Sequence, residues 1–522
     1  MRSVAKTYWI LVVLLAAWLL VWIVLTWPTT LDDALIHLRF ADHLWHQHII
    51  SYDGIHRSFG TSSLLYVALL AVLRGLITTS PVLPRAVSSV ALLALFSLLA
   101  ASLARRLRGA PALAWIFSLL LLTIFVMPSS IRWLDDGMET AITLIFTTLL
   151  AFSTWDFVSP ARRSSLRLAV ALLALGFFTV MLRVEMLLLL AVVSATILSV
   201  QWERRSSGTR SRLSPRVLLE CASPVAGGLL AAALIVLLMH SLLPDTAVAK
   251  SFGFAAWHGM IMGMAGIFAG SMSFGMGPLL LWLLSFAAAV TVRRGFRLSS
   301  LVANSPFPIV MLLTVLRGQA VQGVRYFEWA FLYSIVWNIL DLSSAQRAMP
   351  VRVRRTFFAT AGALGAVLLL SIPVETHLLM PLFRSRENAL AEFRHQDLER
   401  ISNLRVVAFD VGYFGYFTGS PLCDMAGLIN GREAAALPYP QRVLRCAAWQ
   451  PQAGFLDRDQ MRDLNAQYDL SGWSLCAEYE YVNLRLVDPH FLIAAPAQAQ
   501  EVCAAAHGTP RPLAPLLPLA SP

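Results

Sequence analysis

Charged residues are scarce in this sequence. Asp, Glu, Lys and Arg make up 14% of its 522 residues, whereas 57% are hydrophobic. A soluble protein of this size buries one apolar core in each domain and covers it with more charge, so the composition excludes that class. Apolar runs recur over the first 375 residues. They predict a polytopic α-helical membrane protein, because a helix satisfies its own backbone hydrogen bonds in lipid.

Several other signals are missing. The first apolar run, residues 8–25, has no A-x-A-like cleavage site, so we interpret it as a retained anchor rather than a signal peptide. The chain has no short-period repeat and no nucleic-acid-binding pattern, although its net charge is +11. Its arginines lie in short clusters between apolar segments, which is typical of loops that face the cytoplasm and its anionic lipids.

Cysteine is rare as well. There are five cysteines, and none has zinc-finger spacing. Cys221 begins an apolar segment, and the other four lie near the C-terminus. An even set in one soluble region predicts at least one disulfide and an oxidising compartment, with four free thiols as the alternative. The candidates are Cys423, Cys446, Cys476 and Cys503.

Apolar segments of spanning length predict about eleven transmembrane helices. They fall near residues 8–27, 83–104, 111–127, 138–155, 165–182, 184–200, 217–241, 275–292, 299–316, 325–342 and 355–373.

Residues 62–80 form one further apolar segment, but it is short and contains Arg74 and Gly75. If it does not span, most Lys and Arg fall into loops on one side, as the positive-inside rule requires. We therefore expect a juxtamembrane or re-entrant helix there, within a first outer loop that covers residues 28–82. The predicted location is the bacterial inner (cytoplasmic) membrane, with the N-terminus inside.

The hydropathy drops after about residue 373, which separates a transmembrane domain, residues 1–373, from a soluble mixed α/β domain at 374–500. This second domain is expected on the outer, periplasmic side. Within it, "VVAFDVGYFGYF" suggests a strand, a glycine turn and a further strand. The Pro-rich tail, residues 501–522, is expected to be disordered.

The predicted orientation puts the polar loops on the outer face. The first of them contains "LDDALIHLRFADHLW", whose apolar residues recur at three- and four-residue steps and predict a helix lying on the membrane surface. Asp32 and Asp33 stand at its start. A carboxylate at the height of a lipid phosphate can take the proton of an attacking hydroxyl, which makes either one a candidate catalytic base. The alternative is a helix cap in which Thr30 and Asp33 form a capping box.

Cations also gather on the outer face. Arginine suits bidentate contact with a phosphate, and an ionisable group close to a membrane segment is a functional candidate. The proposed phosphate-binding residues are Arg57, Lys250, Arg317 and Arg325. A supporting set that contacts the substrate or holds these arginines comprises Glu139, Asp136, Arg183, Glu185, Asp245 and His37. For each single residue, snorkelling, capping or structural pairing is the alternative.

Metal binding is less favoured than these roles. His43 and His46 are three residues apart on the expected helix and could share a divalent ion, but interfacial side chains are the commoner explanation. No cofactor is expected.

The order of several short motifs resembles a known family. "DDA", "FGTSSLLY", "GMET", "RVE", "PDTAVAK", "DVGYFGYF" and "DMAGL" follow one another between about residues 31 and 430. Together they resemble the GT-C membrane glycosyltransferases, and most closely the mycobacterial terminal arabinofuranosyltransferase (AftB-like) branch. Each motif alone is short, so the resemblance rests on their order.

The resemblance implies a GT-C fold, a periplasmic active site and a polyprenyl-phosphate sugar donor. It also implies transfer to an envelope glycan, lipid or protein, possible use of arabinofuranose, and a catalytic aspartate at Asp32 or Asp33. The family's common Arg-Pro-Glu is Arg183-Val184-Glu185 here, and its Pro-Asn-Thr is Pro244-Asp245-Thr246. The change to Asp245 adds a negative charge near the expected phosphate site.

A transporter or flippase of a lipid-linked precursor is the alternative function. Transporters often have internal repeats and broken helices that meet at mid-membrane. The sequence shows neither feature, and its charges gather at one face.

Overall fold

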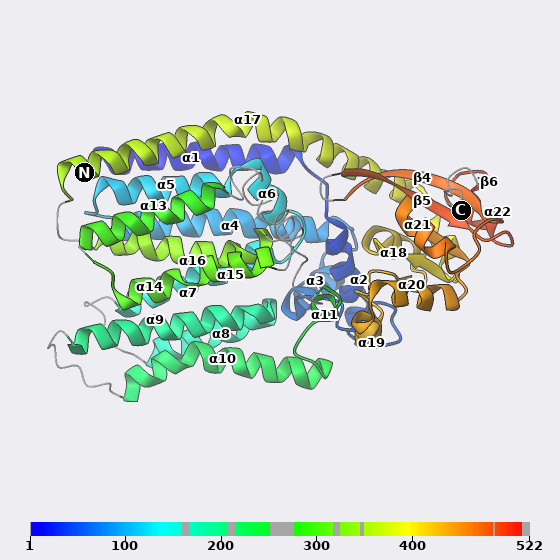
Figure 1. Cartoon of the computed structure of the whole chain (residues 1–522), viewed down its shortest axis with the longest axis horizontal. Helices are drawn as coiled ribbons and strands as arrows, with labels where there is room; N and C mark the ends of the chain where they lie inside the picture. The colour runs from blue at the N-terminus through cyan, green and yellow to red at the C-terminus, as the bar shows by residue number, and fades with distance from the viewer. Residues whose placement is uncertain are drawn as a thin grey trace.

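A computed structural model describes residues 2–158, 166–206, 215–250, 276–293, 295–316, 324–344, 349–483 and 486–513. Most of the chain is a bundle of long helices that lie side by side, with a smaller sheet domain at one end (Figure 1). The bundle contains α1 (Arg2–Leu25), α4 (Leu83–Arg106), α5 (Ala112–Phe125), α6 (Pro128–Leu134), α7 (Thr140–Val158), α8 (Leu166–Leu182), η1 (Val184–Met186), α9 (Leu187–Ser206), α10 (Pro215–Met239), α13 (Met276–Arg293), α14 (Leu298–Asn304), α15 (Pro306–Leu316), α16 (Val324–Ser343) and α17 (Val351–His395).

Each of the eleven predicted spanning segments contains a helix. Within the part of the chain that the structure describes, seven helices are long and apolar enough to cross a membrane, or eight if the bent pair α5 and α6 is one span. The described parts of the segments at α8 and at α14–α15 are shorter than a typical span. Helix α16 is long enough, but it carries Glu328, Asn338 and Asp341, all buried, because it lies inside the bundle and faces protein rather than lipid. By length and composition, the described residues thus contain seven or eight typical apolar spans, and the other predicted segments form helices as well.

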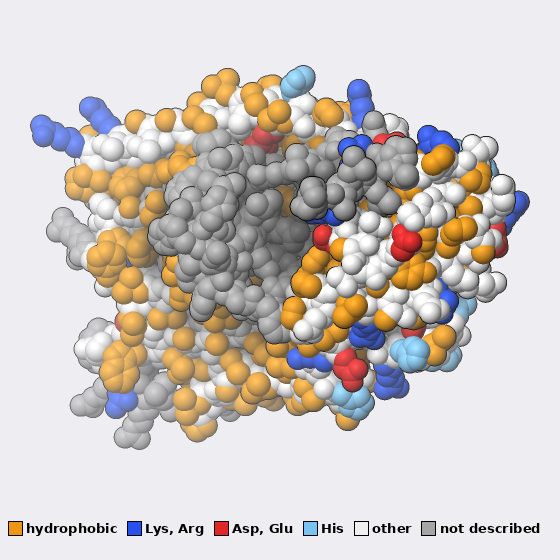
Figure 2. All heavy atoms as spheres, turned by 45° about the vertical axis from the view of Figure 1, so that its right-hand side comes forward, with side chains coloured by type: hydrophobic (Ala, Val, Ile, Leu, Met, Phe, Trp, Pro, Cys, Tyr) orange, Lys and Arg blue, Asp and Glu red, His pale blue; other side chains and the backbone are white. Residues whose placement is uncertain are grey.

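The predicted alternation of loops agrees with the arrangement of the helices. The sheet domain and the short helices α2 (Asp32–Gln47), α3 (Leu64–Leu76) and α11 (Asp245–Lys250) gather at one end, and the N-terminus lies at the other (Figure 1). Hydrophobic side chains cover much of the bundle, Lys and Arg mark its far end, and charged groups are spread over the sheet domain (Figure 2). Helix α3 has 13 residues, about 20 Å, and is too short to cross a bilayer.

Helix α2 differs from its prediction. Residues 34–41 are buried, and α2 packs against α3 on one side and against α18 (Gly412–Thr418) of the sheet domain on another. The helix and its apolar stripe are present, but the sheet domain covers part of the side that was expected to face water, so α2 is more buried than predicted.

The sheet domain contains one six-stranded sheet of order β2-β1-β3-β5-β4-β6. Strand β1 is parallel to its neighbours β2 and β3, whereas β3–β5, β5–β4 and β4–β6 are antiparallel. The strands are β1 (Val406–Ala408), β2 (Leu422–Asp424), β3 (Ala453–Leu456), β4 (Ser474–Asn483), β5 (Leu486–Ala494) and β6 (Arg511–Pro512), and the helices around them are η2 (Leu398–Ile401), α18, α19 (Gly431–Ala436), α20 (Tyr439–Ala448), α21 (Arg458–Asn465) and α22 (Ala499–Ala505).

The stretch "GYFGYF" forms helix α18, so the second predicted strand is wrong. Tyr413, Phe414 and Phe417 stand at helical spacing, and all three rings pack around Phe393 of α17. Burial of these rings on one helical face outweighs the strand preference of aromatic residues.

The disulfide prediction is confirmed. Cys423 and Cys446 are bonded, with their Cα atoms 5.5 Å apart, and Cys476 is bonded to Cys503. The second bond also corrects the predicted tail, because α22 and β6 lie within residues 499–512. Residues 514–522 lie outside the described chain.

Candidate active site

A cavity of about 540 Å³ lies at the end of the bundle next to the sheet domain, a size that suits a small molecule or a lipid head group. Loops and helix ends supply its polar side chains. These are Asp33, His37, Ser62, Glu139, Thr140, Arg183, Glu185, Thr246 and Thr314.

The rest of the wall is apolar. Its largest part comes from the start of α9, the segment before α11, and helices α15 and α16. The apolar lining residues are Ile36, Met138, Val184, Leu187, Leu188, Leu242, Leu243, Pro244, Ala247, Val310, Leu313, Trp329 and Leu428. The cavity is therefore amphipathic, with ionisable groups on one part of its wall and membrane-helix side chains on another.

Glu139 and His37 form the buried centre of the polar wall. His37 Nε2 lies 3.6 Å from Glu139 Oε2, and His37 Nδ1 lies 2.8 Å from Thr61 Oγ1. Ser62 Oγ donates to Glu139 Oε1 at 3.1 Å. Helix α2, the loop before α3 and the residue before α7 thus meet at one carboxylate.

Arg183 is the one Lys or Arg among the described residues that line the cavity. It has an extended backbone between α8 and η1, so the break in the helix directs its side chain to the bundle end. Its guanidinium contacts Glu185 Oε1 at 2.7 Å, and its Nε lies 4.0 Å from Glu139 Oε1. Structural pairing, the alternative to a functional role for Arg183, is therefore present with Glu185 inside the cavity wall.

The two aspartates at the start of α2 face different surroundings. Asp33 lines the cavity. The Asp32 carboxylate is buried instead against the sheet domain, where it accepts N–H bonds from Gly412 at 2.9 Å and Tyr413 at 2.6 Å. Burial, reinforced by the negative charge of Asp410, raises the pKa of Asp32 to about 7 despite these bonds.

The helix-cap alternative is wrong. Helix α2 begins at Asp32, its N-cap position is Leu31, and no side chain makes a capping hydrogen bond there. The Thr30 hydroxyl has no hydrogen-bond partner among the described residues.

Asp136 and Asp245 hold the backbone around the cavity and do not line it. Asp136 accepts from the Met138 N–H at 3.0 Å, within the turn before α7. Asp245 accepts from the Phe59 N–H at 2.9 Å and returns its own N–H to the Phe59 carbonyl at 2.7 Å. An asparagine oxygen could accept the same bond, so the charge of Asp245 is directed at a backbone N–H rather than into the cavity.

The predicted phosphate-binding cations are not assembled within the described side chains. Arg57 is exposed and does not line the cavity. Arg317 lies outside the described residues, as do the side chains of Lys250 and Arg325.

No three His, Cys, Asp or Glu side chains converge as metal ligands within the described ranges. The ring nitrogens of the suggested pair face backbone oxygens, with His43 Nδ1 3.0 Å from the Ser51 carbonyl and His46 Nδ1 3.0 Å from the Asp42 carbonyl.

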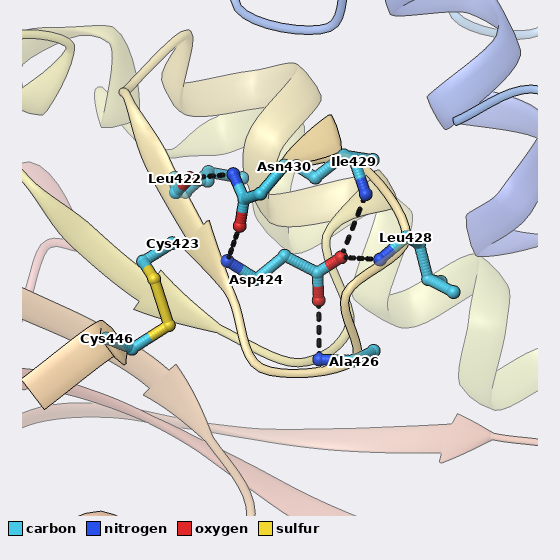
Figure 3. The surroundings of a disulfide bond; sticks show 8 residues. All are labelled: Leu422, Cys423, Asp424, Ala426, Leu428, Ile429, Asn430 and Cys446. Atoms are coloured by element: carbon cyan, nitrogen blue, oxygen red, sulfur yellow. Dashed lines mark hydrogen bonds between the residues drawn. A yellow bond between two sulfur atoms is a disulfide. The ribbon is translucent and has the colours of Figure 1, made fainter. Parts of the chain in front are cut away.

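Leu428, which the sequence analysis did not single out, brings the sheet domain into the cavity wall. The Asp424 carboxylate accepts N–H bonds from Ala426, Leu428 and Ile429, beside the Cys423–Cys446 bond (Figure 3). This loop then presses on Gly60, where an added Cβ would lie 2.6 Å from the Leu428 carbonyl. In the sequence, only the position of Leu428 within the motif "DMAGL" could have identified it.

Trp329 was also missed. It is buried, lines the cavity, and its indole N–H has no acceptor among the described residues. Its position on an apolar helix gave no sequence signal.

A second cavity, of about 560 Å³, lies at the opposite end of the bundle. Trp9, Arg105, Arg108 and Trp115 contribute to it, but none of its described lining residues is a carboxylate or a histidine. It lacks the acid–base groups of the first cavity.

No protein-family model matches the chain, and no curated protein does. Its fold is similar to the crystal structure of ArnT from Cupriavidus metallidurans bound to undecaprenyl phosphate. The match has a TM-score of 0.55 at 13% identity and covers 92% of this chain and 97% of that chain. At this identity the likeness shows the fold alone. The predicted GT-C-like membrane fold with a C-terminal sheet domain is confirmed.

Proposed function

We propose that this chain is an integral-membrane glycosyltransferase that moves a sugar from a polyprenyl-phosphate donor to an envelope glycan, lipid or protein. The observation that carries the proposal is the amphipathic cavity. A lipid-linked sugar has a charged, hydroxylated head and an apolar tail, and the cavity wall offers both kinds of surface at the end of a membrane bundle. The polyprenyl phosphate bound by the similar ArnT structure supports this class of donor.

In the proposed reaction an acceptor hydroxyl attacks the anomeric carbon of the donor sugar. The acceptor oxygen forms the new glycosidic bond, and the carbon–oxygen bond to phosphate breaks. The polyprenyl phosphate leaves with the electron pair, and the hydroxyl proton passes to the Asp33 carboxylate. Asp33 is assigned this role because it lines the cavity, whereas Asp32 is bound to the sheet domain.

Arg183 is placed to stabilise the leaving phosphate. A guanidinium makes strong charge-assisted hydrogen bonds to phosphate, and Arg183 is buried within the cavity wall. Its contact with Glu185 and its proximity to Glu139 hold it in place before the donor binds. Lys250, Arg317 and Arg325 stay predicted partners of the same phosphate.

The two disulfides support a periplasmic sheet domain, because such bonds persist in oxidising compartments. The cavity adjoins that domain, so the proposed reaction takes place on the periplasmic side of the bacterial inner membrane. The AftB-like motif order favours arabinofuranose as the sugar.

A transferase and a flippase can be distinguished in detergent solution. With no membrane separating two sides, only a transferase still has a measurable reaction. We expect the purified protein to convert polyprenyl-phosphoryl arabinofuranose and an arabinan acceptor into an elongated glycan, detected by mass spectrometry. Asp459→Asn, on an exposed surface carboxylate, should retain this activity. Absence of product with every polyprenyl-phosphate pentose tried, together with movement of the labelled lipid across proteoliposomes, would establish the transporter instead.

A further inference from the structure

Helix α18 of the sheet domain contacts helix α2 at both of its own ends. At its start, the Gly412 and Tyr413 N–H groups donate to the two oxygens of Asp32. At its end, Arg39 donates to the carbonyl oxygens of Gly415, Gly419 and Ser420. The first N–H groups of a helix have no partner within the helix, and Asp32 satisfies two of those that α18 leaves open. The Gly415 carbonyl also accepts the Gly419 N–H, and Gly419 and Ser420 follow the last residue of α18, so Arg39 binds the carbonyls at and just beyond the end of this helix.

The charges match this arrangement. A helix favours a negative group at its N-terminal end and a positive group at its C-terminal end. Asp32 and Arg39 are seven residues apart, about two turns and so on one face of α2, and α18 is itself seven residues long. The two helices therefore run parallel. Asp32 lies level with the N-terminal end of α18, and the Arg39 side chain lies level with its C-terminal end. One register of α2 satisfies both contacts.

The fit is close enough to exclude a side chain at Gly412. A Cβ there would lie 2.0 Å from the Asp32 carbonyl oxygen and 2.6 Å from its Cγ. This glycine follows β1 at the carboxyl edge of the parallel strands, where open α/β sheets usually bind their ligands. In this protein the start of α2 occupies part of that edge.

Further hydrogen bonds join residues within or beside the two helices. The Tyr413 hydroxyl donates to the Thr30 carbonyl at 2.5 Å, and the Tyr52 hydroxyl donates to the Val411 carbonyl at 2.5 Å. Arg39 Nε also donates to the Tyr52 carbonyl at 2.8 Å. Asp32 and Arg39 are both buried, so water competes little with these bonds.

The cavity lies on a different side of α2. Asp33 is one residue beyond Asp32, about 100° around the helix axis, and His37 follows four residues later on the same side. A rotation or a shift of α2 along its axis would move both side chains in the cavity together.

We propose that helix α18 is a docking element that fixes the rotation and axial position of α2, and that Asp32 and Arg39 are positioning residues which thereby direct Asp33 and His37 into the cavity. The consequence for transfer rests on the proposed function. Asp32 is then not a second base: it acts through Gly412 and Tyr413, and the C-terminal domain is required for chemistry that takes place in the membrane domain.

The lead variant is Gly412→Ala, which adds one methyl group at the contact and alters no ionisable residue. We expect kcat for sugar transfer to fall by about 10²-fold, the scale of a misplacement near 1 Å, with a smaller change in the donor KM. Gly472→Ala is the matched control in the same domain, because its added Cβ meets only Pro496 Cγ, at 3.5 Å. It should leave kcat unchanged.

A double-mutant cycle separates positioning from direct chemistry. If Asp32 acts only through the docking contact, Asp32→Asn should lower kcat in the wild type and have little further effect in Gly412→Ala. Additive losses would overturn the proposal, because they would give Asp32 a role of its own. Arg39→Lys keeps the charge with fewer donors and serves as the milder variant if Gly412→Ala does not fold. Wild-type kcat in a folded Gly412→Ala or Arg39→Lys protein would also overturn it.

Hydrogen exchange of α2 tests the docking without an activity assay. Gly412→Ala should speed exchange at the amides of α2, and Gly472→Ala should not. If no transferase activity is found but α2 exchange rises, the proposed function fails and the docking stands. Unchanged exchange in α2 would contradict the docking itself.

Discussion

Asp32 and Asp33 are neighbours in the chain with different surroundings. Asp33 lines the cavity, and Asp32 is bound by two backbone N–H groups of the sheet domain. The sequence could place two carboxylates at the start of a helix, but it could not separate them, because the partner of Asp32 lies 380 residues away. Adjacent helical residues point about 100° apart, so at most one of them faces any single site.

The pKa of Asp32 gives the first prediction. Its folded value of about 7 lies above the ordinary value of 3.8. The folded protein therefore holds the proton more tightly than the unfolded chain, so this contribution to stability is present below pH 4 and is lost as the pH rises through about 7. We expect the melting temperature to rise as the pH is lowered from 8 to 5, and to rise less in Asp32→Asn.

The groups that face Asp32 are Asp33 on its own helix, Tyr52 in the loop after it, and Asp410 and Tyr413 from the sheet domain, with His490 bound to Asp410 at 2.8 Å. The comparison of Asp32→Asn with the wild type isolates Asp32 from these neighbours. Identical pH profiles of melting for the two proteins would show that Asp32 is not the group that titrates.

Glu139 gives a second prediction at this scale. It accepts a hydrogen bond from Ser62 and lies near both His37 and Arg183. Glu139→Gln preserves the shape but removes the charge that orients Arg183, so the proposed phosphate contact should weaken. We expect the donor KM to rise about tenfold or more, the effect of one charged hydrogen bond, with a smaller change in kcat. A fall in kcat alone would assign Glu139 to the chemical step.

At the scale of elements, hydropathy predicted the long helices of the bundle but not the short helix α6 or the burial of each helix. The lengths of the apolar segments predicted α8, α14–α15 and α16. In the described chain, none of these helices meets the length and hydropathy of a typical membrane span. Helix α16 lies inside the bundle, so its polar residues pack against other helices, a context that a linear pattern does not contain. The burial of α2 was missed because α18, from a distant part of the chain, covers one of its faces. Helix α18 was missed because its rings pack around Phe393 of α17, which is also a contact between separate segments.

The disulfide loop gives a prediction at the same scale. Cys423–Cys446 and the Asp424 cradle hold the loop that carries Leu428 to the cavity (Figure 3). Replacing both cysteines by alanine should destabilise the sheet domain by about 2–4 kcal/mol and raise the KM for a substrate. The Cys476–Cys503 bond closes a loop of similar length that does not border the cavity. Replacing these two cysteines by alanine should therefore lower the stability but leave the KM unchanged. Equal KM effects from both pairs would argue against a specific role for the loop.

At the scale of the whole molecule, the charge pattern predicts the orientation. Among the described residues, Arg105 and Arg106 end α4, Arg204 and Arg205 end α9, and Arg293 ends α13. These helix ends lie at the end of the bundle away from the sheet domain (Figure 1). We expect reporter fusions after Arg108 and after Arg386 to report the cytoplasm and the periplasm, respectively. Signals from the same side would contradict the predicted topology and would also leave the disulfides without an oxidising compartment.

From the sequence alone, only those residues of the proposed site that lie in recognisable local motifs could be predicted. The loop motifs identified Asp33, His37, Glu139, Arg183 and Glu185, all of which line the cavity. Leu428 and Trp329 join them through the fold of separate domains and helices, and charge patterning could not show that Arg57 does not line the cavity.

The most direct test of the whole account is single-turnover transfer by Asp33→Asn. The donor is bound first, so that its affinity and the chemical rate are measured separately. We predict normal insertion, melting temperature and donor binding, with a transfer rate lowered by about 10²–10⁴-fold, the contribution expected of a general base. A transfer rate within a few-fold of the wild type would contradict the central claim that Asp33 activates the acceptor in this cavity.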